Sequence, residues 1–157
     1  MKIRHFKIKI AALAMMLFTG MDGIAQDVYP EYHVNLFVNA TDKGKVLAGA
    51  QVDVYAGDEL LYTQPIEYFD QRISLPRNGY YTLVFRREQF HPKKVIVNTY
   101  APYSADTLQM VFDIEMIDGK YPDLYGGLPV ALIRYSKSRE KLIYDTSYQQ
   151  YVALKTE

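Results

Sequence analysis

Two histidines, His33 and His91, lie beyond residue 25, and histidine is the side chain that most often serves as a general base or a metal ligand. No second histidine lies at a spacing that would place two imidazoles on one metal ion. His33 falls on the polar face of an expected strand and His91 precedes Pro92 at a strand entrance, so we expect a surface and a turn position. The chain also lacks cysteine and a Gly-x-Ser-x-Gly elbow. We therefore expect no catalytic residue, no metal and no cofactor.

Asp113 and Glu115 are the best candidates for paired carboxylates, because they point the same way from one expected strand. Their separation along the strand is about 7 Å. Two carboxylates so placed could bind calcium or act as an acid/base pair. The favoured expectation is a solvated sheet face.

A local cluster of basic residues flanks Phe90: Arg86, Arg87, Lys93 and Lys94. The whole chain has 18 basic and 18 acidic residues, whereas nucleic-acid binders usually carry a marked basic excess. We therefore exclude nucleic acid as a partner. The cluster is expected to be a solvated edge, where lysines discourage aggregation.

Tyrosine is abundant, with 15 residues, and several fall in expected loops. Tyr100 and Tyr103 lie in one connection, and Tyr121 and Tyr125 lie in the next. Exposed tyrosines suit protein or sugar contacts, because the ring offers area at small entropic cost and the hydroxyl forms hydrogen bonds. The strand between these loops would separate them by about 33 Å, so they are expected to form two sites rather than one.

The elements that would position these residues are strands, since hydrophobic side chains recur at every second position. In 32–39, for example, Tyr32, Val34, Leu36 and Val38 share one face. Turn signals recur every 8–12 residues or so, as in a β-sandwich. The fold class expected is all-β: an antiparallel β-sandwich of seven to nine strands with a short C-terminal helix over 145–154, capped by Asp145. The expected strands are 32–39, 50–56, 59–64, 70–75, 80–86, 93–98, 108–117, 130–135 and, as a ninth, 141–144, with every proline between strands.

Alternating strand directions would bring the connections 40–49, 65–69, 87–92 and 118–129 to one end of the sandwich. Two interpretations of that end stay open: a binding surface, or rings that cover the core as a lid. The candidate binding residues there are Tyr68, Arg87, Phe90, His91, Tyr121 and Tyr125.

The N-terminus has the three-part layout of a secretory signal peptide. Four positive charges precede an apolar run from Ile10 to Phe18, which is far shorter than the roughly 20 residues of a membrane span. Gly23 and Ala25 fit cleavage after residue 25. Because exported chains without cysteine are commoner in bacteria than in animals, we expect a Gram-negative periplasm or cell surface, with no membrane-spanning segment in the mature chain.

Three segments resemble the carboxypeptidase regulatory-like domain family: GKVLAGAQVDVY at 44–55, LPRNGYYTL at 75–83 and FHPKKV at 90–95. The resemblance covers about 32–117 and implies a transthyretin-like (prealbumin-like) sandwich of the kind common in secreted and outer-membrane proteins of Bacteroidetes. It places the domain at 26–117, and the tail 118–157 looks like an extension packed on it. The hydroxyisourate hydrolases share that sandwich but end in Tyr-Arg-Gly-Ser, which this chain lacks.

Such domains are generally non-catalytic, so the resemblance implies an interaction or structural module rather than an enzyme. Its expected partner is another cell-envelope protein. The alternative is a carbohydrate-binding or adhesin-like module in which loop tyrosines contact a glycan.

Overall fold

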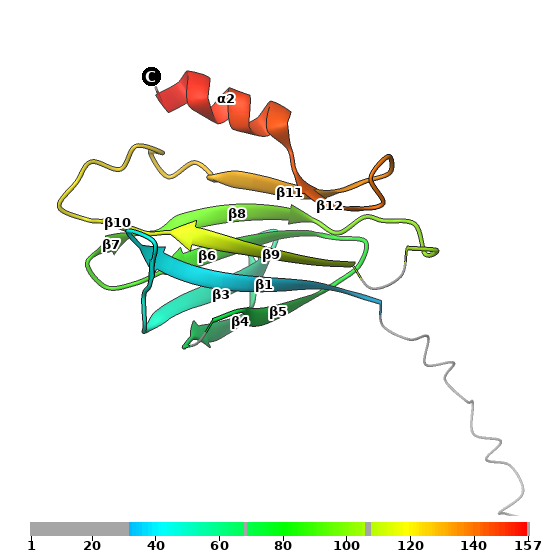
Figure 1. Ribbon diagram of the computed structural model, residues 1–157, viewed down its shortest axis with the longest axis horizontal. Coiled ribbons are helices and arrows are strands. Elements are labelled where there is room, and N and C mark those ends of the chain that lie inside the picture. The colour runs from blue at the N-terminus through cyan, green and yellow to red at the C-terminus, as the bar shows by residue number, and fades with distance from the viewer. Residues whose placement is uncertain (1–31, 68, 106–107, 157) are drawn as a thin grey trace, which may run out of the picture. The chain divides into compact units, whose positions relative to one another are not determined.

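The computed structural model describes residues 32–67, 69–105 and 108–156. The expected signal peptide 1–25 and the candidate residue Tyr68 lie outside the described residues. The described chain is mostly strand, with one helix near its C-terminus (Figure 1). Its elements are β1 (His33–Asp42), β2 (Lys45–Val46), β3 (Ala50–Ala56), β4 (Glu59–Ile66), β5 (Gln71–Pro76), β6 (Tyr80–Arg86), β7 (Phe90–His91), β8 (Lys93–Asn98), β9 (Leu108–Glu115), β10 (Ile117–Asp118), β11 (Ala131–Ser136), β12 (Lys141–Tyr144) and α2 (Thr146–Thr156).

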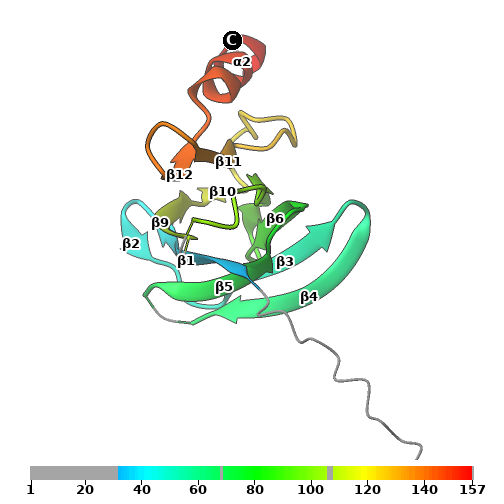
Figure 2. The same ribbon diagram turned by 90° about the vertical axis from the view of Figure 1, so that its right-hand side faces the viewer.

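The strands form two main sheets and one small one. In the first sheet β2, β5 and β9 all pair with β1; the second has the order β12-β11-β8-β6-β3-β4; and β10 pairs with β7. The expected extension thus supplies β11, which joins the second sheet beside β8. In both views α2 lies beyond β11 and β12, on the side away from β4 (Figures 1 and 2).

The expectation of a purely antiparallel arrangement is wrong, because β9 runs parallel to β1 and β11 runs parallel to β8. The strands alternate direction along the chain, but each of these pairs joins two strands that begin at the same end. The connection after β8 stays at the end where β8 ends and β1 begins, and the connection after β10 stays at the end where β8 begins (Figure 1). The sheets are therefore mixed.

Period-two alternation builds the core from the inner faces of both sheets. Val34, Leu36 and Val38 of β1 are fully buried, as is Phe85 of β6. The Phe85 ring meets the Phe112 ring of β9 edge to face, with centroids 6.4 Å apart, so this pair joins the two sheets. Tyr32 departs from the expected pattern: it precedes β1 and is 46% exposed.

Side chains of β4 close one side of the two-sheet structure by bonding to the edge of β5. The Tyr62 hydroxyl donates to the Ser74 carbonyl (3.2 Å), and the Gln64 amide donates to the Arg72 carbonyl (2.9 Å). These bonds satisfy carbonyls that an edge strand leaves unpaired. Pro65 lies within β4 rather than between strands, which an outermost strand tolerates because its outer N–H groups bond to no neighbour. Pro76 likewise ends β5.

The periodicity predicted most strand bounds. The expected strands 50–56, 80–86, 93–98 and 141–144 coincide with β3, β6, β8 and β12. The expected strand 108–117 is instead split, because β9 ends at Glu115 and the chain turns through buried Met116 into β10. The two-residue strands β2, β7 and β10 were not predicted, since two residues carry no periodicity.

The helix α2 begins after Asp145, which caps it as expected. The Asp145 carboxylate accepts hydrogen bonds from the backbone N–H groups of Ser147 (2.9 Å) and Tyr148 (3.1 Å). It also accepts a bond from the Arg134 guanidinium of β11. The Arg134 bond, followed by the cap bond from Tyr148, holds the pKa of Asp145 below its usual value. One carboxylate therefore caps the helix and ties it to the sheet.

Replacing Asp145 with alanine is expected to lower the free energy of unfolding by about 1–2 kcal/mol at neutral pH, through loss of the cap and of the bond to Arg134. Because the folded-state pKa of Asp145 is depressed, its contribution is present above the ordinary carboxyl pKa and fades as the pH falls through the folded value. Urea unfolding at several pH values measures this loss. The matched control is Gln150→Ala on the exposed side of α2, and equal losses in the two variants would contradict the assignment.

Candidate functional site

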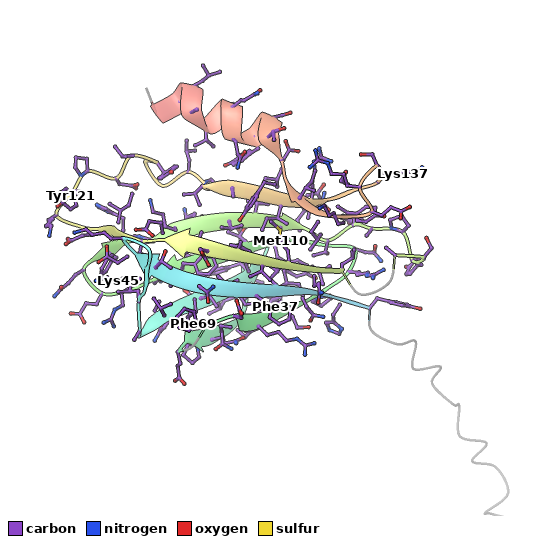
Figure 3. All side chains as sticks on the ribbon, in the orientation of Figure 1. Phe37, Lys45, Phe69, Met110, Tyr121 and Lys137 are labelled. Carbon is purple, nitrogen blue, oxygen red and sulfur yellow. The ribbon has the colours of Figure 1, made fainter. Side chains whose placement is uncertain are left out.

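The five described candidate residues lie at the end of the sheets where β7 meets β10, although they do not form one cluster: Arg87, Phe90, His91, Tyr121 and Tyr125. Ile117 pairs with His91, and Asp118 pairs with Phe90. His91 Nε2 lies 2.6 Å from the Tyr121 carbonyl oxygen and ties the loop after β10 to β7. Figure 3 labels Tyr121 on that loop. The structure thus brings Phe90, His91 and Tyr121 together.

Tyr125 takes a different position, above Lys93. The Lys93 Nζ lies 4.1 Å from the centroid of the Tyr125 ring. Asp123 shapes this loop by accepting hydrogen bonds from the backbone N–H groups of Tyr125 (3.1 Å) and Gly127 (3.1 Å). Phe90 and Tyr125 are half-buried, while Tyr121 is exposed. Part of this end therefore covers the interior and part of it faces solvent.

The Arg87 carbonyl accepts the Phe90 N–H (3.1 Å), but the Arg87 side chain lies beside Gly49. Its guanidinium donates to the Gly49 carbonyl (3.2 Å), and a Cβ added at Gly49 would lie 2.5 Å from the Arg87 Nη1. Gly49 has a φ of +76°, which a side chain would also disfavour. Arg87 and Gly49 line a shallow surface hollow with Glu88 and Pro92. Arg87 therefore braces the start of β3.

The expectation of a basic edge is wrong for Lys93 and Lys94, which both lie on β8. β8 lies inside the six-stranded sheet, between β6 and β11, so it is no edge. Its alternation turns Lys93 inward on the same face as Val95 and Val97, and Lys93 is only 2% exposed. Lys94 points to the other face. The spacing in the sequence could have predicted this inward position, because Lys93, Val95 and Val97 follow one another at intervals of two residues.

Arg86, in the same basic cluster, is paired. Its Nε lies 3.0 Å from the Asp53 carboxylate, and its guanidinium also donates to the Tyr55 hydroxyl (3.3 Å). Of the four basic residues, one is therefore buried, one is in an ion pair and one braces Gly49. They do not form a single charged surface.

Asp113 and Glu115 are exposed, on a sheet face as expected, and each is bonded to β1 or the turn after it. Asp113 accepts a hydrogen bond from the Asn39 amide (2.8 Å). Glu115 accepts bonds from the Thr41 hydroxyl (2.6 Å) and from the backbone N–H groups of Lys43 and Gly44. The Thr41 bond is the largest cause of a lowered pKa at Glu115. These carboxylates therefore join β9 to β1 through side-chain hydrogen bonds.

The opposite end of the sheets carries exposed tyrosines that the sequence argument grouped only in part. Tyr103 packs against Tyr32 with ring centroids 6.0 Å apart, and Tyr80 packs against Tyr100 at 5.5 Å. The Asn78 amide donates to the Tyr103 hydroxyl (3.2 Å). We call Tyr32, Tyr80, Tyr100 and Tyr103 the tyrosine end. Tyr32 and Tyr80 were missed because one was assigned to the core and the other to a strand.

A cavity of about 290 Å³ lies between β8, β9, β11 and the loop that carries Tyr125. Lys93 and Tyr125 line it together with apolar side chains that include Val95, Phe112 and Val130. No group of three or more His, Asp or Glu residues in the described part of the chain is placed to hold a metal ion. Within the same residues, no helix has the length and apolar character needed to cross a membrane.

No known protein-family model matches the chain, and no curated protein sequence matches it either. Among solved structures, the chain is similar to chlorocatechol 1,2-dioxygenase from Pseudomonas putida, at 15% sequence identity and a TM-score of 0.27. The alignment covers 55% of this chain and 60% of the dioxygenase chain, which is less than two thirds of that chain's length. A likeness of this size carries no argument about fold or activity.

The Thr41–Glu115 bond gives a testable pH dependence. Replacing Thr41 with valine removes the hydroxyl and is expected to lower the free energy of unfolding by about 1 kcal/mol or less at neutral pH, because Glu115 is partly exposed to solvent. The folded-state pKa of Glu115 is depressed, so the bond stabilises the protein above the ordinary glutamate pKa and ceases to do so as the pH falls through the folded value.

Urea unfolding of the wild type and of Thr41→Val at neutral and at acidic pH measures this effect. The difference between the two proteins should shrink at acidic pH. A difference that stays constant with pH would show that the lost stability comes from packing at Thr41 rather than from the charged bond.

Proposed function

We propose that this protein is a non-catalytic binding module of the bacterial cell envelope, and that its partner is another envelope protein. The observation that carries the proposal is the tyrosine end, where Tyr32, Tyr80, Tyr100 and Tyr103 are between 46% and 70% exposed. Tyrosine supplies contact area and a hydrogen-bonding hydroxyl with only two side-chain torsions to fix, and it is enriched in protein-binding surfaces for that reason.

The backbone of the tyrosine end is held by a set of hydrogen bonds, most of them partly buried, which favours binding without large rearrangement. Thr99 is fully buried, and its hydroxyl donates to the Pro76 carbonyl (2.9 Å) and accepts from the Gly79 N–H (3.0 Å). The Arg77 guanidinium donates to the carbonyls of Pro102 (3.2 Å) and Ala105 (2.6 Å). These bonds lock the turn after β5 to the loop after β8, so the rings are presented from a fixed backbone.

The export layout of residues 1–25 supports a location in the periplasm, in the outer membrane or at the cell surface of a Gram-negative bacterium. The family resemblance supports a transthyretin-like β-sandwich and a Bacteroidetes source. The two mixed sheets around one core are compatible with that fold class. Asp113 and Glu115 accept hydrogen bonds from Asn39 and Thr41, which favours a structural role for these two carboxylates over acid/base work.

A glycan is the second candidate partner. It is favoured by the neighbouring exposed rings of Tyr80 and Tyr100, which offer a sugar two faces set 55° apart. The hydroxyl of Tyr103 and the amide of Asn78 lie on the same loops and could bond to sugar hydroxyls. An envelope protein is the main proposal because the two ring pairs, Tyr32 with Tyr103 and Tyr80 with Tyr100, offer more contact area than one sugar ring needs.

The double variant Tyr100→Ala/Tyr103→Ala is expected to weaken partner capture by about tenfold or more, since tyrosines near the centre of an interface contribute about 2 kcal/mol each. Crosslinking and pull-down from envelope fractions measure the capture, and a glycan array measures sugar binding. The matched control is Tyr121→Ala, an equally exposed tyrosine at the opposite end.

Loss of one specific protein partner in the double variant, with no sugar signal, supports the main proposal. A sugar signal lost in the same variant supports the glycan instead. Capture that survives the double variant but falls in Tyr121→Ala would contradict the placement of the surface.

A further inference from the structure

The cavity beside Lys93 has the make-up of a small-molecule site. It lies between β8 and β9, which belong to different sheets, and it opens on the side opposite the β4–β5 bonds. Its volume of about 290 Å³ is near the lower limit for pockets that bind small ligands. Its walls combine apolar side chains and the rings of Phe112, Tyr125 and Tyr144 with polar groups, which include the carboxylates of Asp113 and Glu115.

Lys93 is the polar group in this cavity whose hydrogen-bonding needs are unmet. The side chain is 2% exposed, and its Nζ has no hydrogen-bond partner in the described part of the protein. The face of the Tyr125 ring lies 4.1 Å from Nζ. An ammonium carries three N–H donors, and burying it without acceptors is costly. A ligand in this cavity could therefore supply the hydrogen-bond acceptor that the Lys93 ammonium lacks.

The carboxylates nearby do not fill that role, because their oxygens are bonded elsewhere. Glu115 is bonded to Thr41 and to the turn after β1, and Asp113 is bonded to Asn39. Both oxygens of Asp123 accept backbone N–H groups of its own loop. Burial lowers the pKa of Lys93, and the charge of Asp123 acts in the opposite direction. A ligand carboxylate at Nζ would therefore be the first direct acceptor for this amine.

We propose that this cavity binds a small organic carboxylate, whose oxygens accept hydrogen bonds from Lys93 while its apolar body packs against Val95, Phe112 and Val130. Val95, Phe112 and Val130 disfavour an inorganic anion in this part of the cavity, because it would lose hydration against them without compensation. The limited volume selects for a short or single-ring body. Tyr125 covers the ammonium on one side, so the ligand meets a charge that solvent already reaches poorly, and such a bond is stronger than at an open surface.

This proposal does not depend on the tyrosine end, since it uses other residues at another place. The variant Tyr100→Ala/Tyr103→Ala is therefore expected to bind the carboxylate like the wild type. A failure of the partner experiment would leave the cavity proposal standing, and the reverse also holds.

The direct test is calorimetric titration of the purified protein with benzoate, phenylacetate and hexanoate, each beside its uncharged amide. At least one carboxylate is expected to bind with a Kd of about 1 mM or tighter, and its amide about tenfold more weakly or not at all. Lys93→Met is expected to weaken carboxylate binding by about tenfold or more. Lys94→Met is the matched control, because the neighbouring side chain points to the other face of the sheet.

A second measurement, made on the wild-type protein, tests the proposal even if the Lys93→Met variant does not fold. In the wild type, the Cε resonance of Lys93 followed by NMR against pH should report a higher pKa when the carboxylate is bound. Lys93→Met should itself fold, since an apolar side chain replaces a buried cation that has no acceptor. Absence of binding by all three carboxylates, equal binding of the amides, or a Lys93 resonance that does not respond would each overturn the proposal.

Discussion

The alternation of side chains between the core and the outer face, shared by strands of both sheets, is the constraint that the rest of this structure obeys. β1 buries Val34, Leu36 and Val38 against a second sheet whose β6 buries Leu83 and Phe85. Neither sheet could shield these side chains alone, because each presents one apolar face. The edge-to-face contact between Phe85 and Phe112 is where the two faces meet most directly. A one-residue slip in any of these strands would expose its whole apolar set.

The same alternation explains which features of the fold could be predicted from the sequence and which could not. Strand bounds such as those of β3, β6 and β8 follow from local periodicity, so they could be predicted. The parallel pairs β1–β9 and β8–β11 could not, because pairing between distant segments leaves no local pattern. Lys93 was assigned to the surface by its charge, although its spacing from Val95 and Val97 placed it inside. The charge of Lys93 favoured the surface and its spacing favoured the core, and the spacing predicted its position correctly.

The candidate site could be predicted less well than the fold. The grouping of Phe90, His91 and Tyr121 follows from strand direction, and the structure brings them together through β7 and β10. Tyr125 instead covers Lys93, and Arg87 instead holds Gly49, because single side-chain contacts depend on loop paths that the sequence does not encode locally. The pairing of Tyr32 with Tyr103 and the cavity beside Lys93 depend on contacts between distant segments of the chain, so local patterns could not predict them.

The packing of the two sheets is the claim on which both proposed sites depend, and nuclear Overhauser effects between aromatic rings test it most directly. The rings of Phe85 in β6 and Phe112 in β9 lie with centroids 6.4 Å apart, and the Phe112 and Tyr144 rings have the same separation. Cross-peaks between the ring protons of Phe85 and Phe112, and between those of Phe112 and Tyr144, are expected in the folded protein. A folded protein whose Phe112 ring shows neither cross-peak would contradict the two-sheet core and, with it, the positions of Lys93 and the tyrosine end.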